Sequence, residues 1–124
     1  MAKQLLRIDL DTNFHLYGIS CHLKDYRFAW IINKNLGVDF KKTKPYTTID
    51  GFEFSKYEHL MDLEKIFLFA NKSKNGFLIK KKKEVDYWMM FHQSFEEKYI
   101  NNFVRIIRTL QPVLVVFEEK NSQT

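Results

Sequence analysis

The sequence predicts an α+β fold, with a mostly antiparallel sheet of about five to seven strands and two amphipathic helices packed on one of its faces. Short stretches in which apolar and polar residues alternate are separated by turn dipeptides, as in antiparallel strands. Longer stretches repeat their apolar residues with the period of a helix. The 124 residues, 45% hydrophobic and 16% aromatic, are enough for a single domain with one core.

The chain is expected to begin with a hairpin. Leu6, Ile8 and Leu10 alternate with polar residues and predict a strand. Residues 11–13, Asp-Thr-Asn, then supply a turn. Residues 14–19 are predicted to be the hairpin partner of that first strand.

A helix is predicted over residues 20–37. Ser20 is of a type that often caps the start of a helix, and Gly37 is of the type found just past the end. The apolar arc of this helix holds Leu23, Tyr26, Phe28, Ala29, Trp30, Ile32 and Leu36. The opposite arc carries Lys24, Arg27, Lys34 and Asn35. We therefore expect the first arc to face the sheet and the second to face water.

The middle of the chain is expected to form a block of antiparallel strands. Residues 39–46 are polar and predict a loop closed by Pro45. The dipeptides Asp50-Gly51 and Asn75-Gly76 favour tight turns. Strands are expected at residues 52–60, 63–70, 77–79 and 85–92, with a turn at Met61-Asp62. The last strand, VDYWMMFH, is apolar on both faces apart from Asp86, which predicts a central strand covered by helices on one side.

The second helix is predicted from a capping box formed by Ser94 and Glu97, and Pro112 ends it. Its apolar arc holds Phe95, Tyr99, Ile100, Phe103, Ile106, Ile107 and Leu110. Residues 113–117 are expected to close the chain as a strand. We expect residues 1–118 to form a single α+β domain and residues 119–124 to be a flexible tail.

The charge of the chain permits anionic partners without requiring them. Lys and Arg number 20 against 15 Asp and Glu, which gives a net charge of +5 and a pI near 9.3. No apolar run approaches the roughly 20 residues that span a bilayer, so no membrane contact is expected. The only cysteine, Cys21, excludes an intramolecular disulfide and agrees with a reducing compartment, so we expect a cytoplasmic protein.

The stretch IKKKKEVDY, residues 79–87, sets four adjacent lysines inside strand-like sequence. Burying even one unpaired charge costs several kcal/mol, so this segment is expected at the surface between buried strands. Asp86 follows in an otherwise apolar strand, and its carboxylate needs water, backbone donors or a basic partner. Arg27 and Lys24 are the partners considered, in a role that anchors helix to sheet. A catalytic acid is the alternative role for Asp86.

Residues 79–87 resemble the signature of a family of small bacterial proteins named IPExxxVDY. Ile79, Val85, Asp86 and Tyr87 match at the required spacing, whereas Lys80 and Lys81 replace the Pro and Glu. Other stretches similar to the family are Gly18-Ile19-Ser20, HLKDYR at 22–27, Trp30, Asn33-Lys34 and Asn75-Gly76. The resemblance covers most of the chain and implies no catalytic residue. A family function that depends on a rigid acidic turn is not expected to transfer to this chain.

Other patterns indicate chemistry only weakly. Asp9, Asp11 and Asn13 match the opening of a calcium loop, but its required Gly and Glu positions hold Phe14 and Ser20. The same stretch resembles the paired aspartates of haloacid-dehalogenase-type phosphatases. We interpret these residues as carboxylates on a strand and in its turn.

Cys21 and His22 are predicted to lie at the start of a helix, where the helix dipole can activate a thiol. The remaining histidines lack the spacing of a metal site. No catalytic residue, cofactor or metal is predicted, and a small buried thiol is the favoured interpretation of Cys21.

Our leading hypothesis is a non-catalytic cytoplasmic interaction domain that acts through a protein partner or by self-association. The alternative is an accessory RNA- or DNA-binding protein that uses lysine-rich surface clusters. An enzyme centred on Asp86 with His22 or Cys21 is the third hypothesis. The candidate binding or structural polar residues are Lys24, Asp25, Arg27, Lys80, Lys81, Lys82, Lys83, Asp86, Tyr87, Lys98, Arg105 and Arg108.

Overall fold

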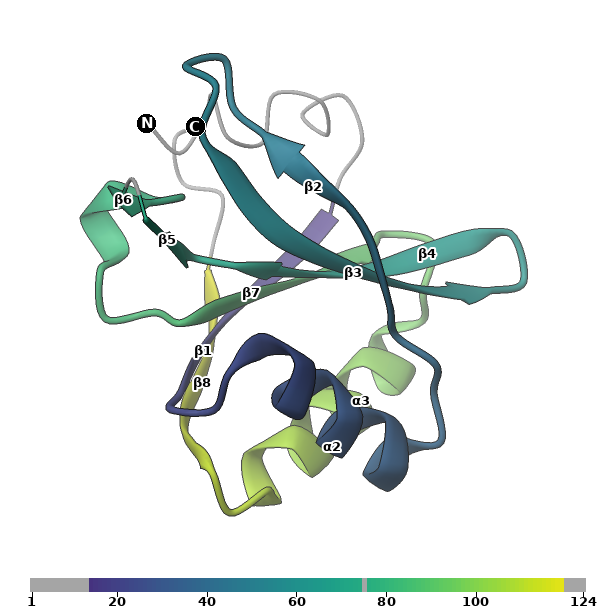
Figure 1. The fold of residues 1–124 in the computed structure, drawn as a ribbon. Coiled ribbons are helices and arrows are strands. Elements are labelled where there is room, and N and C mark those ends of the chain that lie inside the picture. The colour runs from purple at the N-terminus through teal and green to yellow at the C-terminus, as the bar shows by residue number, and fades with distance from the viewer. Residues whose placement is uncertain (1–13, 75, 120–124) are drawn as a thin grey trace.

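The fold is α+β, as predicted, in a computed structural model that describes residues 14–74 and 76–119 (Figure 1). In chain order its elements are β1 (Phe14–Cys21), α2 (Asp25–Leu36), β2 (Lys41–Thr47), β3 (Glu53–Met61), β4 (Glu64–Ala70), β5 (Lys72–Ser73), β6 (Gly76–Phe77), the 3-10 helix η2 (Lys80–Lys82), β7 (Tyr87–His92), α3 (Glu97–Thr109) and β8 (Val113–Glu119).

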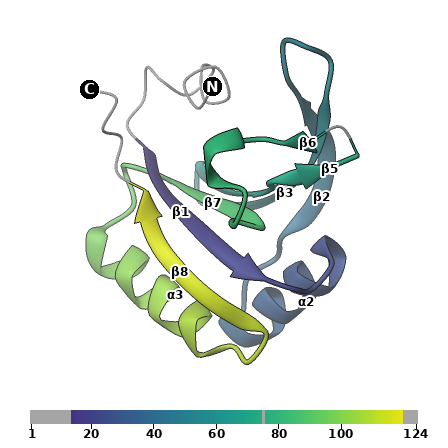
Figure 2. The ribbon, with the colours of Figure 1, turned by 90° about the vertical axis from the view of Figure 1, so that its left-hand side faces the viewer.

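One antiparallel sheet organises the molecule. Its six strands follow the order β2-β3-β4-β7-β1-β8, and β5 pairs with β6 in a separate ribbon. Both helices pack below the sheet in Figure 1, while the segment that contains β5, β6 and η2 lies on the opposite side. The view in Figure 2 shows the same division. The prediction of helices on one face of the sheet is therefore confirmed.

The sheet is buried on both faces, which explains the continuous apolar sequence of β7. Tyr87, Met89 and Phe91 join the core between sheet and helices. Trp88 and Met90 point to the other face and join a second core. The flanking strands β4 and β1 both pair with β7, so the central position predicted for this strand is confirmed.

The predicted N-caps of the helices are wrong by four residues for α2 and by two for α3. Ser20 lies in β1, where its hydroxyl donates a hydrogen bond of 2.8 Å to the Glu84 carbonyl, and Lys24 is the residue before α2. Ser94 lies in the turn after β7, and α3 begins at Glu97. Neither helix has a side-chain cap, because Ser20 lies in the sheet and Ser94 lies in a turn. The predicted end at Gly37 is confirmed by its left-handed φ of 69°.

Residues 39–46 were predicted to be a loop, and this prediction is also wrong. They contain most of β2, an edge strand with Pro45 inside it. An edge strand tolerates proline, and the register shifts between Thr43 and Tyr46 at this point. The turn at Asp50-Gly51 is confirmed, with Gly51 at a φ of 90°. At the end of the chain, β8 continues past the predicted limit to Glu119.

The predicted strand at residues 6–10 and its turn lie outside the described residues. However, β1 pairs with β7 from Phe14 to Ile19 and with β8 from Leu16 to Cys21. Since each strand has only two edges, residues 16–19 have no edge left for a hairpin partner. The hairpin expected at the start of the chain is therefore wrong over these residues.

The segment that covers the second face of the sheet is named here the lysine lobe, and it consists of residues 72–74 and 76–85. Its apolar residues Leu78, Ile79 and Val85 point inward and are buried in the second core. Its lysines lie at the surface, with Lys80, Lys81 and Lys83 exposed and Lys82 partly exposed. The prediction that this run lies at the surface is confirmed.

Asn71 attaches the lysine lobe to the sheet. It is fully buried, and its amide nitrogen donates to the carbonyls of Lys82 at 2.9 Å and Val85 at 2.8 Å. Its amide oxygen accepts from the Ile79 N–H and from the Trp88 indole N–H, both at 2.9 Å. The side chain thus makes every hydrogen bond that a primary amide offers, and it satisfies four groups inside the core.

Replacing Asn71 by Ala is expected to destabilise the fold by about 3 to 5 kcal/mol, because buried donors and acceptors that lose their partner cost about 1 to 3 kcal/mol each. Urea unfolding measures this change. Asn35→Ala is the control, since the Asn35 amide makes one exposed hydrogen bond to Ile31 and should change stability by less than about 0.5 kcal/mol. Equal stability of the two variants would contradict the role given to Asn71.

Candidate functional site

A cleft of about 460 Å³ opens where the end of β1, the start of α2 and the start of β7 meet. Residues 21–25 form one wall, and Ser55, Ala70, Lys72 and the pair Asp86 and Tyr87 form the rest. Its volume lies in the range of small-ligand sites, about 300 to 1,000 Å³. Four of the predicted candidate residues therefore meet here: Lys24, Asp25, Asp86 and Tyr87.

Asp86 is held at the floor of the cleft by two partners. Its Oδ2 accepts a hydrogen bond of 2.7 Å from the Cys21 N–H, and its Oδ1 lies 2.6 Å from the Lys72 ammonium. The carboxylate is only 16% exposed, so both contacts compensate the loss of water. The expected basic partners, Arg27 or Lys24, are wrong, because the partner is Lys72. Asp86 therefore joins β1 to the lysine lobe and does not anchor α2.

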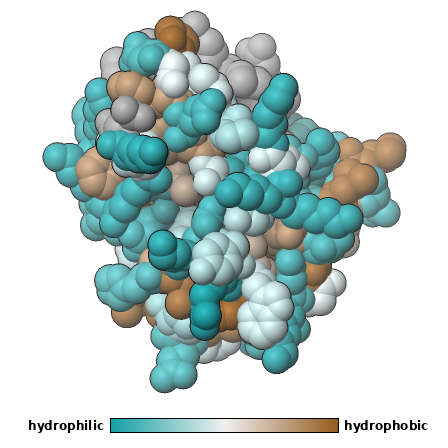
Figure 3. All heavy atoms as spheres, in the orientation of Figure 1, coloured by the Kyte–Doolittle hydropathy of each residue, from teal (hydrophilic) through white to brown (hydrophobic). Residues whose placement is uncertain are grey.

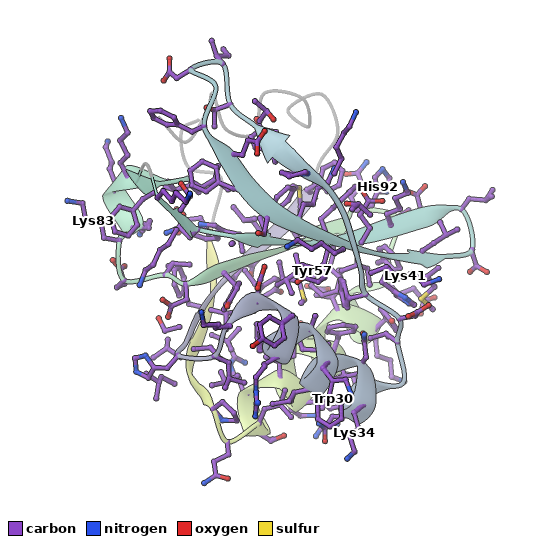
Figure 4. All side chains as sticks on the ribbon, in the orientation of Figure 1. Trp30, Lys34, Lys41, Tyr57, Lys83 and His92 are labelled. Carbon is purple, nitrogen blue, oxygen red and sulfur yellow. The ribbon has the colours of Figure 1, made fainter. Side chains whose placement is uncertain are left out.

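Tyr87 lines the cleft and Tyr57 lies next to Asp25 of its wall, and both phenols hold their protons tightly. The Tyr87 hydroxyl donates to the Leu23 carbonyl, and burial together with the nearby Asp25 carboxylate raises the pKa of Tyr87. Burial also raises the pKa of Tyr57 to about 12, with further increases from the Asp25 charge and from a hydrogen bond to that carboxylate. Figure 4 shows Tyr57 between the sheet and α2. Asp25 thus connects the start of α2 to β3.

The Cys21 thiol is buried, and burial raises its pKa, although a hydrogen bond with the Leu23 backbone acts in the opposite direction. A raised pKa keeps the sulfur protonated and weakens it as a nucleophile. The interpretation of Cys21 as a small buried thiol therefore agrees with its surroundings. Cys21, Tyr57 and Tyr87 therefore all favour their protonated forms.

Within residues 14–74 and 76–119, no three His, Cys, Asp or Glu side chains are placed to hold a metal ion together. His92 lies 3.5 Å from Glu64, and His15 lies 3.8 Å from Glu118, so these histidines sit in separate pairs. Asp9, Asp11 and Asn13 of the calcium-loop and phosphatase patterns lie outside the described residues.

The other candidate residues lie on separate elements. Arg27 is exposed on α2, and Lys98 and Arg105 are exposed on α3. Arg108 of α3 donates a hydrogen bond of 3.1 Å to the Val116 carbonyl of β8. The lysine lobe lies across the sheet from both helices, so its lysines and those of α3 do not form one surface (Figures 1 and 2).

Sequence reasoning missed several residues of this region: Ser55, Tyr57, Asn71 and Lys72. The pairing of Lys72 with Asp86 arises because β4 lies beside β7. Asn71 follows a strand and precedes a turn-rich segment, so its type indicated a turn.

The fold and the cleft define a small α+β domain with a polar, partly buried recess beside the start of a helix. A scan of this chain against protein-family models finds no match, and a search of curated proteins finds none either. Among the described residues, neither helix is long and apolar enough to cross a bilayer.

Tyr57→Phe is expected to make the stability of the protein less sensitive to alkaline pH. Because the pKa of Tyr57 rises from 10.0 to about 12 on folding, the unfolded chain ionises first as pH rises. The contribution of this phenol is complete below about pH 10 and is lost as pH approaches about 12. Urea unfolding at both ends of this window should show a smaller loss for the variant. An identical loss in both proteins would mean that Tyr57 ionises normally.

Proposed function

We propose that this protein is a non-catalytic cytoplasmic interaction domain that binds another protein through the outer face of α2. The observation that carries the proposal is the exposure of Tyr26 and Trp30, each 60% exposed and one helical turn apart. The sequence predicts both in the arc that faces the sheet, and this prediction is wrong. Large aromatic side chains left at the surface in this way are typical of interaction sites.

The outer face of α2 is not needed for the core. Phe28, Ala29 and Ile32 bury the inner face of the helix against the sheet. On the outer face, the Lys34 ammonium lies 4.9 Å from the centre of the Trp30 ring. Figure 4 shows Trp30 and Lys34 together on the side of α2 that points away from the sheet. In Figure 3 the region over α2 carries pale side chains among hydrophilic ones.

The charges around the aromatic pair favour an acidic partner over a second copy. Arg27 and Lys34 are exposed on α2, and Lys24 is exposed just before it. Two such faces would repel each other on contact, whereas an acidic surface with an apolar centre complements them. We therefore propose a different protein as the occupant, and self-association becomes an outcome of the test.

We also propose a cytoplasmic location and membership of a bacterial family. The free, buried Cys21 thiol supports a reducing compartment and hence the cytoplasm. Membership of the bacterial IPExxxVDY family is proposed on the match of Ile79, Val85, Asp86 and Tyr87 to its signature. The last two of these residues line the cleft next to the start of α2.

Affinity purification from native extract, treated with nuclease, tests the proposed binding face. The wild-type protein should retain an acidic protein in stoichiometric amount. The double variant Tyr26→Ala, Trp30→Ala should bind this partner at least tenfold more weakly, because an aromatic hot spot contributes about 2 kcal/mol or more. The control Ile49→Ala, Leu63→Ala removes apolar side chains that are 70% and 93% exposed elsewhere, and it should keep the partner.

Equal retention of the partner by both double variants would reject the α2 face. Light scattering provides the second arm of the test. If the wild-type protein is a dimer and the double variant at Tyr26 and Trp30 is a monomer, the occupant of the α2 face is a second copy of this chain and not a different protein. A monomer that retains no stoichiometric protein at all would reject the proposed function.

A further inference from the structure

The lysine lobe carries the entire net charge of the chain. Residues 72–85 contain six Lys and one Glu, a net charge of +5, which equals that of the whole sequence. The rest of the chain is therefore neutral, with 14 Lys and Arg against 14 Asp and Glu. The lobe that holds this excess of lysines lies on the face of the sheet opposite the helices (Figure 1).

The backbone that carries these lysines is held in one conformation. Asn71 binds it at Ile79, Lys82 and Val85, and its inward side chains are buried. Among the described residues, the ion pairs of the lobe are those of Lys72 with Asp86 and of Lys82 with Glu119, the latter at 3.6 Å. Within the part of the chain that the structure describes, Lys74, Lys80, Lys81 and Lys83 have no carboxylate within ion-pair distance. These four ammonium groups are available to an anionic ligand.

We infer that the lysine lobe binds the phosphate backbone of a duplex nucleic acid. Its exposed charged side chains are lysines and one carboxylate, Glu84, and ammonium groups neutralise phosphates without reading sequence. Its apolar residues Leu78, Ile79 and Val85 point into the core, so they are not available to enter a lipid bilayer. Unlike the outer face of α2, the described residues of this lobe expose no large apolar side chain, which disfavours a protein as the occupant.

The aromatic rings of this region favour a duplex over a single strand. Single strands bind by stacking their bases on open aromatic faces. Here the Lys83 ammonium lies 5.8 Å from the centre of the Phe77 ring, and the Lys82 ammonium lies 5.6 Å from that of Phe117. Each ring thus has a lysine over one face, and both rings are partly buried. Backbone contact with a duplex needs no stacking platform.

This inference is independent of the proposed protein partner. Trp30 and Lys34 point away from the sheet on the helix side, whereas Lys83 projects from the lobe on the other side (Figure 4). A change at one surface leaves the other intact. A variant of the lobe should therefore retain the acidic partner, which separates the failure of one proposal from the failure of the other.

Fluorescence anisotropy with labelled 20-base-pair DNA and RNA duplexes, from about 50 to 200 mM salt, tests the inference. Affinity should fall as salt rises. The logarithm of the association constant plotted against the logarithm of the salt concentration should have a slope of about −3 to −4, as expected for contact with about four phosphates. The triple variant Lys80→Gln, Lys81→Gln, Lys83→Gln should weaken binding at least tenfold and reduce the magnitude of the slope by about 2 to 3.

The triple variant Lys41→Gln, Lys44→Gln, Lys98→Gln is the matched control, since it removes the same charge from exposed sites on β2 and α3. It should change affinity less than threefold. Equal weakening by both triple variants would overturn the assignment to the lobe. The inference would also fail if the duplexes did not bind at low salt, or if a single strand or anionic phospholipid vesicles bound more tightly than the duplexes.

Discussion

The buried amide of Asn71 is the constraint on which the arrangement of this protein depends. The sheet is apolar on both faces, and its helices cover only one of them. The lysine lobe packs Leu78, Ile79 and Val85 on the other, although its sequence is among the most highly charged of the chain. Asn71 resolves this conflict because it satisfies the polar groups of the turn inside the core while the lysines stay in water. The lobe can therefore pack against the sheet and still present a charged surface to water.

The same connection shapes the cleft. The backbone N–H of Asn71 donates to the Asp86 carbonyl, and the next residue, Lys72, pairs with the Asp86 carboxylate. Asp86 in turn binds the Cys21 N–H at the end of β1. The lobe, the cleft and the path of the chain into α2 thus share one network. The two proposed binding surfaces lie at its opposite ends, on opposite faces of the sheet.

Periodicity predicted the fold class, the central strand and the surface position of the lysines, because each follows from where apolar groups can be buried. The predicted helix starts are wrong because Ser20 and Ser94, although of a type that often caps a helix, lie in a strand and a turn. The predicted burial of Tyr26 and Trp30 is wrong because a hydrophobic arc does not show how much of a helix the sheet can cover. The partner of Asp86 depends on which strands become neighbours, and local periodicity does not show the strand order. Asn71 was missed because an asparagine before a turn is usually exposed.

The most direct test of the central claim is amide hydrogen exchange of the lobe measured by NMR. The N–H of Leu78 donates to the Asn71 carbonyl at 2.7 Å, and the N–H of Ile79 donates to its side-chain oxygen at 2.9 Å. If Asn71 holds the lobe closed, both amides should exchange nearly as slowly as those of β7, with the free energy of global unfolding. Exchange of Leu78 and Ile79 as fast as that of an open loop, beside a protected β7, would contradict the account.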